Sequence, residues 1–568
     1  MKKILEYLRP QMWVMIWQFT VKFAGTLIEL LLPIMLSHIL NNIVVLNDMN
    51  AVYFWGGLMV LCSAVALLAN VYANQLSTKI SKKITQKLRY DLFRKTEYLS
   101  CKKADEFLIP SLISRLTSDT YNVHQMIDRM QRLGIRAPIL LIGGILLTFT
   151  LEPVLTLVLV CVLPLLGFII WLISHKGIPL YTKTQISLDT LVRKIQENMT
   201  GVRVIKALSK TDYETERFEE ANLNVVKNEQ KANALMAITN PAMNLLLNAG
   251  LIVVIIIGAY RVNADFTKPG TIIAFMNYFV IILNALLMVS RLFVLLSKGA
   301  ASAERISEVL CSEEDILLIE SEKKPSEFHI EYNSVDFSYN GIRNDLEGIS
   351  FKIKRGETLG IIGGTGSGKT TLISLLLRFY DPNKGEILID GRNIKSIPNE
   401  ILHTRFGVVF QNDFLFADTI RENINFGRSL DNDAIEHAVR TAQANFVYEK
   451  ENGFAHELTV KGANLSGGQK QRLLISRALA ANPDILLLDD CSSALDYKTD
   501  ASLRKAMKQE FDGTTTIIIT QRISSIMGAD HIIMLDEGKI IGQGTHSTLL
   551  DSNSAYREIF DAQMGEVL

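Results

Sequence analysis

The chain has 568 residues, more than the roughly 100 to 200 of one globular core, so at least two domains are expected. Its Lys+Arg and Asp+Glu counts are both 59, and the resulting net charge of zero argues against a nucleic-acid partner. Hydrophobic residues make up 48% of the chain, which must therefore combine an apolar part with a charged part. Five scattered cysteines without ligand spacing argue against a disulfide or zinc framework.

The N-terminal half contains apolar stretches long enough to cross a bilayer. About 20 apolar residues span about 30 Å of hydrocarbon as a helix. Six stretches meet this requirement, at 12–40, 51–76, 135–151, 154–173, 240–260 and 271–296. One such stretch alone, such as the third, is also compatible with a buried core helix. Six in order predict a membrane domain, and membrane lipid is then one of its partners.

The distribution of basic residues predicts how these spans are oriented. Many Lys and Arg residues lie between the second and third spans, whereas the turn at 41–50 has none. Because basic segments stay in the cytoplasm, we expect a multi-pass protein of the cytoplasmic membrane with both termini inside. The segments 77–134 and 174–239 are charged, with apolar residues at helical spacing, and are expected to be helices that continue into the cytoplasm.

A change of composition separates this part from the rest of the chain. A run of Glu, Lys and Ser with Pro325 replaces the apolar stretches. The expected boundaries are a transmembrane domain over 1–311, a linker over 312–327 and a second domain over 328–568.

The second domain contains a phosphate-binding motif. A β-rich run at 358–362 leads into Gly363-Gly364-Thr365-Gly366-Ser367-Gly368-Lys369-Thr370, which has the pattern G-x-x-x-x-G-K-T. Its glycines allow successive backbone N–H groups to converge on phosphates, and Lys369 reaches the outer ones. The Thr370 hydroxyl completes a Mg²⁺ site at the start of the following helix. The motif predicts binding of ATP with Mg²⁺.

A second motif supplies carboxylates. The apolar run 485–488 is typical of a buried parallel strand, and it ends in Asp489 and Asp490. Ligands bind at the carboxyl edge of such sheets. Asp489 is expected to hold Mg²⁺, which prefers oxygen ligands.

Between these motifs lies Leu465-Ser466-Gly467-Gly468-Gln469, and here the sequence resembles the ABC transporter ATPase family, whose signature these residues match. Alone they could form an ordinary glycine-rich turn, but their position between the nucleotide motifs is that of the signature. In the membrane half, 112–119 and 201–207 are similar to cytoplasmic loops of ABC exporters. The resemblance implies an α-helical membrane domain of six transmembrane helices with long cytoplasmic extensions, followed by an α/β P-loop nucleotide-binding domain.

The resemblance also implies roles for single residues. Tyr339 matches the aromatic residue that stacks on adenine, although a core aromatic is the alternative. Gln411 matches the glutamine that reaches Mg²⁺ and the attacking water, although a solvated loop amide is the alternative. The segment 493–496 resembles the loop that joins the two ATP sites. The expected ATP-binding residues are Tyr339, Gly363, Gly364, Thr365, Gly366, Ser367, Gly368, Lys369, Thr370, Thr371 and Gln411. The expected Mg²⁺ ligands are Thr370, Gln411 and Asp489, and the expected catalytic residues are Asp490, Gln521 and Gln411.

Two of these catalytic positions depart from the family pattern. Asp490 stands where the family has a glutamate as general base, and its shorter side chain draws the carboxylate back from the attacking water. Proton transfer needs heavy atoms within about 2.6 to 3.2 Å, so the shorter reach impairs catalysis. Gln521 replaces the family's switch histidine and cannot carry a positive charge. The alternative is that Asp490 acts through an extra water.

Because nucleotide domains of this family pack head to tail, the intact signature would complete a site on a partner. The pattern is similar to the degenerate subunit of a heterodimeric exporter, which holds ATP durably at its own site while its signature completes the competent site of a second half-transporter. The alternatives are a homodimeric exporter or lipid flippase with slow sites, and a nucleotide-gated regulator or channel.

The transported substrate is not specified by the motifs. Lys22 and Glu29, seven residues apart in the first span, are functional candidates because charges in lipid are costly. A structural ion pair is the alternative. Asn277, Asn284 and Arg291 mark one face of the sixth span, which we expect to line a cavity.

Overall fold

The computed structural model describes residues 2–312 and 316–564. Contacts divide the chain into two compact units. The first consists of residues 1–98 and 108–312, and the second of residues 99–107 and 313–568. The short segment 99–107 therefore packs with the second unit, although its neighbours in the sequence on both sides belong to the first.

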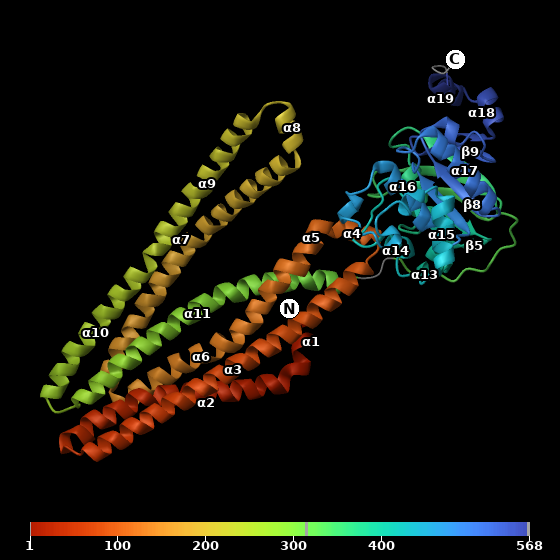
Figure 1. The fold of residues 1–568 in the computed structure, drawn as a ribbon. Helices are drawn as coiled ribbons and strands as arrows, with labels where there is room; N and C mark the ends of the chain where they lie inside the picture. Colours follow the sequence, from red (N-terminus) through yellow and green to blue (C-terminus); the bar gives the residue numbers. More distant parts are fainter. Residues whose placement is uncertain (1, 313–315, 565–568) are drawn as a thin grey trace. The chain divides into compact units, whose positions relative to one another are not determined.

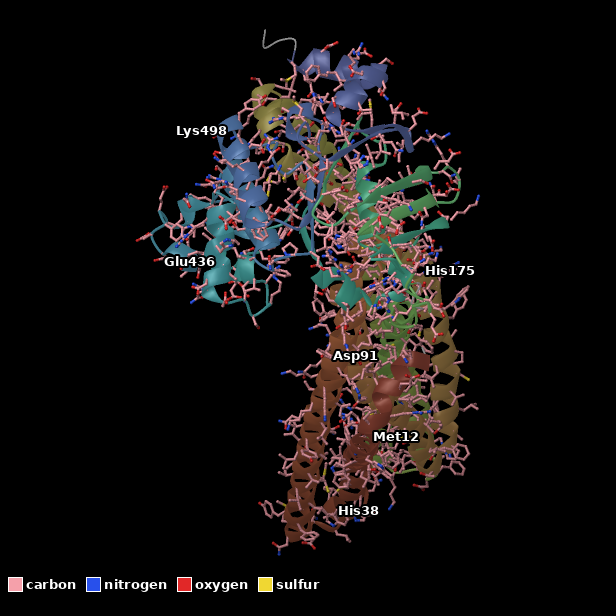
Figure 2. All side chains as sticks on the ribbon, turned by 90° about the vertical axis from the view of Figure 1, so that its right-hand side faces the viewer. Met12, His38, Asp91, His175, Glu436 and Lys498 are labelled. Carbon is pink, nitrogen blue, oxygen red and sulfur yellow. The ribbon has the colours of Figure 1, made fainter. Side chains whose placement is uncertain are left out.

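The first unit is built from long helices (Figure 1). Its α-helices are α1 (Lys2–Leu8), α2 (Met12–His38), α3 (Met49–Glu97), α5 (Ile109–Ser114), α6 (Thr120–Leu151), α7 (Pro153–Thr200), α8 (Val202–Ala207), α9 (Thr211–Ala237), α10 (Thr239–Asn263) and α11 (Pro269–Leu310). Within residues 2–312 and 316–564, six segments are long and apolar enough to cross a membrane, as the sequence predicted. Met12 and His38 mark the two ends of α2 in Figure 2.

The predicted helical extensions are present. The second span continues without interruption to Glu97, and the fourth continues to Thr200. Helices α2, α3, α6 and α11 pack against one another, whereas α7 packs with α9 and α10 in an arm that diverges from them at one end (Figure 1). Apolar side chains such as Leu30, Leu159 and Phe279 fill the interior.

The charged residues of the first span have different partners from those expected. Lys22 and Glu29, for which a structural ion pair was the alternative, do not pair with each other: Glu29 pairs with Arg136 of α6, and the Lys22 amine donates to Asn74 Oδ1 of α3, 3.0 Å away. Each side chain reaches a neighbouring helix rather than its own. On the sixth span, Asn277 and Asn284 are exposed. The Arg291 side chain lies outside the part of the chain whose side chains are described.

The second unit contains two sheets. Strands β1 (Ile330–Phe337), β2 (Leu346–Ile353), β4 (Lys384–Ile389) and β5 (Arg392–Asn393) form an antiparallel sheet in the order β2-β1-β4-β5. Strands β3 (Thr358–Gly363), β6 (Phe406–Val409), β7 (Ile485–Asp489), β8 (Thr515–Ile519), β9 (His531–Asp536) and β10 (Lys539–Gly544) form a second sheet in the order β10-β9-β3-β8-β7-β6. All neighbours in this second sheet are parallel except β9 and β10.

Helices cover these sheets. They are α4 (Cys101–Phe107), α12 (Lys369–Leu376), α13 (Asn399–Thr404), α14 (Ile420–Asn425), α15 (Asn432–Thr441), α16 (Gly467–Leu479), α17 (Tyr497–Glu510), α18 (His546–Ser552) and α19 (Ser554–Met564). One apolar core joins both sheets to α12, and a second joins α14 to α17 with β6 and β7. Within this unit the Tyr380 hydroxyl donates to Asp105 of α4, which anchors that helix.

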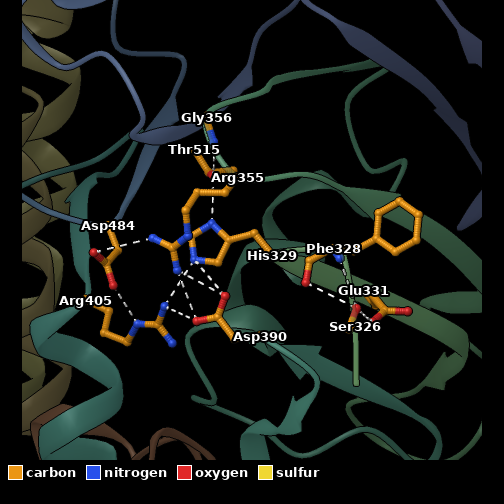
Figure 3. A network of polar contacts seen from close by, with 10 residues as sticks. All are labelled: Ser326, Phe328, His329, Glu331, Arg355, Gly356, Asp390, Arg405, Asp484 and Thr515. Atoms are coloured by element: carbon orange, nitrogen blue, oxygen red, sulfur yellow. Dashed lines mark hydrogen bonds and ion pairs between the residues drawn. The ribbon is translucent and has the colours of Figure 1, made fainter. Parts of the chain in front are cut away.

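A polar network joins the two sheets at the end where the parallel strands begin (Figure 3). His329 is buried at its centre, and Arg405 donates from Nη2 to His329 Nε2 at 3.1 Å. Nδ1 then carries the proton and faces Thr515 Oγ1 at 2.6 Å. Asp390 accepts from both Arg355 and Arg405. The network closes the domain at the edge opposite to the strands' carboxyl ends.

Candidate nucleotide-binding site

Three parallel strands bring the predicted motifs to one edge of the sheet. Strand β3 ends at Gly363, β7 at Asp489 and β8 at Ile519, and Asp489 lies opposite Ile519 in the register. Strand β8 lies between β3 and β7 and is parallel to both, so the carboxyl ends of the three strands lie at the same edge of the sheet. This edge therefore brings together the phosphate-binding loop, the two carboxylates and the segment 520–522.

The phosphate-binding loop follows β3 and leads directly into α12. Gly366 and Gly368 have φ of +83° and +100°, values that side chains other than glycine rarely adopt. A Cβ at Gly363 would meet the backbone oxygen of Leu535 at 2.2 Å. Lys369 donates from Nζ to Gly363 O at 2.9 Å, so its amine lies over the loop. The first turn of α12 adds N–H groups that favour an anion.

A pocket of about 610 Å³ surrounds this loop. Its lining residues are Arg343, Asn344, Asp345, Thr365, Gly366, Ser367, Gly368, Lys369, Thr370, Thr371, Asp536, Glu537 and Gly538. Most of the predicted ATP-binding residues thus share one cavity. The other wall of the pocket is formed by 343–345 and 536–538, which carry no phosphate-binding pattern in the sequence.

Charges at this edge influence one another. Burial lowers the pKa of Lys369, and Asp489 and Asp490 oppose this shift. Burial raises the pKa of Asp489 to about 6, with Asp490 adding to the effect and Lys369 opposing it. A nearby cation would stabilise the ionised form of such a buried carboxyl.

The altered catalytic positions lie at the same edge. Asp490 is half-buried and has φ of +49°, and burial raises its pKa while the charges of Arg522 and Lys369 oppose the rise. Gln521 is exposed. Arg522, which no motif in the sequence pointed to, donates a hydrogen bond from Nη2 to Ser493 O at 3.4 Å.

Tyr339 and Gln411 are both exposed residues of the nucleotide-binding unit. Tyr339 is 46% exposed, which excludes the core aromatic, and its hydroxyl lies 3.5 Å from Thr371 Oγ1 of α12. Gln411 is exposed shortly after β6, the neighbour of β7. Neither residue lines the pocket around the loop.

The segment Leu465–Gln469 starts a helix and does not reach that pocket. Ser466 is the N-cap of α16, and Gln469 N donates to Ser466 Oγ while Ser466 N donates to Gln469 Oε1 at 3.0 Å. Two such reciprocal bonds hold the first turn of the helix. Within the described residues of this single chain, none of these five side chains lines the pocket.

Comparisons with known proteins identify the family. The family described as "ABC transporter transmembrane region" matches residues 15–286, and that described as "ABC transporter" matches residues 346–493. The uncharacterized ABC transporter ATP-binding protein YfiB of Bacillus subtilis is 34% identical over 100% of this chain and 99% of its own. The chain belongs to the ABC transporter family.

Other relatives of this ABC transporter chain are similar over their full length. The uncharacterized protein YknU of Bacillus subtilis is 31% identical over 100% of this chain and 98% of its own. A bacterial Atm1-family ABC exporter, solved with ATP bound, has a TM-score of 0.83 and 23% identity, with 98% of each chain covered. The fold is that of an ABC exporter, and the chain is an integral membrane protein.

The residues at the edge fit Mg²⁺ and ATP. Thr370, Asp489 and Gln411 offer only oxygen ligands, which Mg²⁺ requires, and the raised pKa of Asp489 shows a carboxyl that a cation would stabilise. The bound ion would neutralise phosphate oxygens in the reaction. In this ABC transporter chain, Lys369 and the loop amides would face the remaining phosphate charge.

In this ABC transporter chain, Gln471 makes a contact that no motif in the sequence predicted. Gln471 of α16 donates from Nε2 to Ser493 Oγ at 3.1 Å and accepts from Ala494 N at 3.0 Å. It thereby joins the signature helix to the loop 493–496. A glutamine two residues after the signature gave no signal in the sequence, because its partners are distant in the chain.

Proposed function

We propose that this chain is one half of a dimeric ABC exporter, and that its own hydrolytic site is the weaker of the two. Its expected domains are a transmembrane domain over 1–311, a linker over 312–327 and a nucleotide-binding domain over 328–568. Both termini lie in the cytoplasm, and the six spans cross the cytoplasmic membrane.

The separation of two motifs supports a dimer. The phosphate-binding loop forms a pocket with 343–345 and 536–538, whereas Ser466 and its neighbours in the signature do not line that pocket. A signature that acts on ATP therefore acts on the ATP of another chain. Sites shared in this way close when ATP binds and reopen after hydrolysis.

One observation carries the proposal of a weak site: Asp490 and Gln521 occur together beside an intact phosphate-binding loop. Asp490 follows Asp489 at the end of β7, so its backbone position is fixed and only the side-chain length differs from glutamate. Burial raises the pKa of Asp490 while the charges of Arg522 and Lys369 oppose the rise, so the weakness that we propose comes from the shorter reach of the side chain and not from a loss of basicity. The residues that bind the phosphates are thus retained, whereas the side chain at position 490, which would accept the proton, is one methylene shorter than glutamate.

The test is steady-state ATP hydrolysis by the chain purified alone and by the mixed assembly with its partner half-transporter. In the chain alone, Asp490→Glu should raise turnover by about 10² or more, and Gln521→His should raise it further. In the mixed assembly, Asp490→Asn should have little effect, whereas replacing the partner's glutamate with glutamine should stop transport.

Other results would decide against the proposal. If the unmodified chain alone hydrolyses ATP and transports as fast as the mixed assembly, it is a homodimeric exporter or lipid flippase and Asp490 is a working base. If ATP opens an ion conductance in liposomes without substrate-dependent hydrolysis, the chain is a nucleotide-gated channel.

A further inference from the structure

Polar side chains form a buried seam between α2, α3 and α6. On α2, Gln18 and Lys22 lie one turn apart, and both are buried. Gln18 donates from Nε2 to the backbone oxygen of Gln131 at 3.2 Å, which joins the seam to α6. Lys22 donates to Asn74, which joins it to α3. Within a membrane span such a seam is costly and needs a reason.

Among the described residues, the Lys22 amine has no anionic hydrogen-bond or ion-pair partner. Its side chain is 2% exposed, and its hydrogen bond to Asn74 Oδ1 is to a neutral amide. Across residues 2–312, the nearby carboxylates are engaged elsewhere: Glu29 pairs with Arg136, and Asp128 pairs with Arg132 at 3.0 Å. An ammonium ion has three donors, so two of its N–H groups remain available.

Other polar groups of the seam also lack partners within the described chain. Gln131 is 5% exposed, and neither Nε2 nor Oε1 makes a hydrogen bond. Because both ends of this amide are unpaired, exchanging its oxygen and nitrogen would not change the conclusion. Arg136 Nε, Glu29 Oε2 and Asn70 Oδ1 are likewise buried and unpaired. Buried polar groups are nearly always satisfied, so a concentration of exceptions indicates a missing partner.

The charges define the class of that partner. Lys22 and Arg136 contribute two positive charges and Glu29 one negative charge, which leaves one positive charge uncompensated. The unpaired donors are on Lys22, Gln131 and Arg136. We propose that these three residues form a binding site for an anionic group, a carboxylate or a phosphate, within the transmembrane unit.

This inference rests on the proposed export function, which it deepens by giving the carried molecule an anionic group. A purely structural seam would have no reason to leave both ends of the Gln131 amide unpaired. Two sources of the anion share this chemistry: a soluble carboxylate or phosphate, and the headgroup of an anionic phospholipid.

The test measures how fast a cysteine in the seam reacts with charged thiol reagents. Asn70→Cys is placed in a full-length chain whose native cysteines are replaced, reconstituted in phosphatidylcholine nanodiscs. Rates are compared for a sulfonate-bearing methanethiosulfonate and for its trimethylammonium counterpart, each normalised to a free thiol. The anionic reagent should react about tenfold faster, because a site of one charge concentrates the opposite ion.

Lys22→Met should remove this preference, whereas Lys79→Met, which removes an exposed charge from α3, should leave it intact. Gln131→Cys serves as a second reporter if Asn70→Cys does not fold. Lack of reaction with either reagent, equal normalised rates, or a preference that survives Lys22→Met would each overturn the anion site.

Protection experiments identify the source of the anion. Slower reaction with the sulfonate reagent in nanodiscs containing phosphatidylglycerol indicates a lipid headgroup, and slower reaction after adding glutamate or inorganic phosphate indicates a soluble anion. Protection by none of them would overturn the proposal. The thiol assay needs no ATP, so a negative result would overturn the anion site without testing the proposed export. Failure of the export proposal would be seen separately, as the absence of ATP-dependent transport.

Discussion

The side chain of Gln563 donates a hydrogen bond from Nε2 to the backbone oxygen of Gln521, 2.7 Å away. Its Oε1 accepts from Ile523 N at 2.8 Å, so one amide of α19 binds the backbone on both sides of Arg522. Tyr556 of the same helix is buried in one cluster with Ile523. The last described helix thus holds the loop that carries the altered switch position.

Gln563→Leu should therefore reduce the ATP turnover of the chain purified alone. The loss of two hydrogen bonds of about 1 kcal/mol each predicts a fall of up to roughly thirtyfold, in kcat more than in the affinity for ATP. Steady-state hydrolysis and nucleotide binding would be measured on the same preparation. Glu558→Leu, an exposed change on the same helix, is the control. Equal turnover of both variants would contradict a positioning role.

Lys369→Ala should weaken ATP binding at this chain's own site, because it removes the positive charge above the loop. Binding of a fluorescent ATP analogue to the assembled transporter would be measured. Lys508→Ala, which removes an exposed charge at the end of α17, should bind as the unmodified chain does. Unchanged affinity in Lys369→Ala would remove the assignment of the loop.

Ser466→Ala should instead abolish hydrolysis at the partner's site. The substitution also removes a helix cap, which costs about 1 kcal/mol of stability. Asp431→Ala is a matched control, because Asp431 caps α15 of the same unit by accepting from Ala434 N at 2.7 Å. Stability should fall in both variants, but hydrolysis only in Ser466→Ala. Full activity in Ser466→Ala would contradict the head-to-tail arrangement.

Glu29→Gln should lower the thermal stability of the transporter in detergent, because it leaves the half-buried Arg136 without its counter-ion. Breaking a partly buried pair costs up to about 3 kcal/mol. The double variant Glu29→Gln with Arg136→Gln should recover part of that loss, and Glu6→Gln, which is exposed, should cost little. Normal stability with lost transport would show that the carboxylate acts on the substrate.

The protein should lose stability in acid through His329. Burial, followed by the charge of Arg355, lowers the pKa of His329 from 6.5 to about 4, whereas Asp390 opposes this and Arg405 adds to it. Between pH 6.5 and about 4 the unfolded chain binds a proton that the folded chain does not, so stability falls as pH falls. The loss is at most about 3 kcal/mol.

Thermal unfolding from pH 7.5 to 4.5 would measure this effect. His329→Asn removes the titrating group and should unfold more easily at pH 7.5 but with a shallower dependence on pH. His329 is among the groups that lower the pKa of Asp390, so the difference between the slopes reports His329 together with its effect on that carboxylate. Identical slopes would contradict the assignment.

The sequence by itself determined the spans and the order of the nucleotide motifs. Local patterns suffice there, because a span needs only a continuous apolar stretch, and a loop of the type 363–370 needs only its own glycines, lysine and hydroxyl. The replacements at Asp490 and Gln521 were also visible, since they stand at fixed places in those patterns.

The tertiary structure alone decided which distant residues meet. Lys22 and Glu29 share a helix face, yet each reaches a different neighbouring helix, because a side chain at a helix interface contacts the opposing helix rather than a residue two turns away. Gln471 and Gln563 have no motif and gain their partners only through packing. Contacts between segments far apart in the chain depend on the fold's register, which a single sequence does not display.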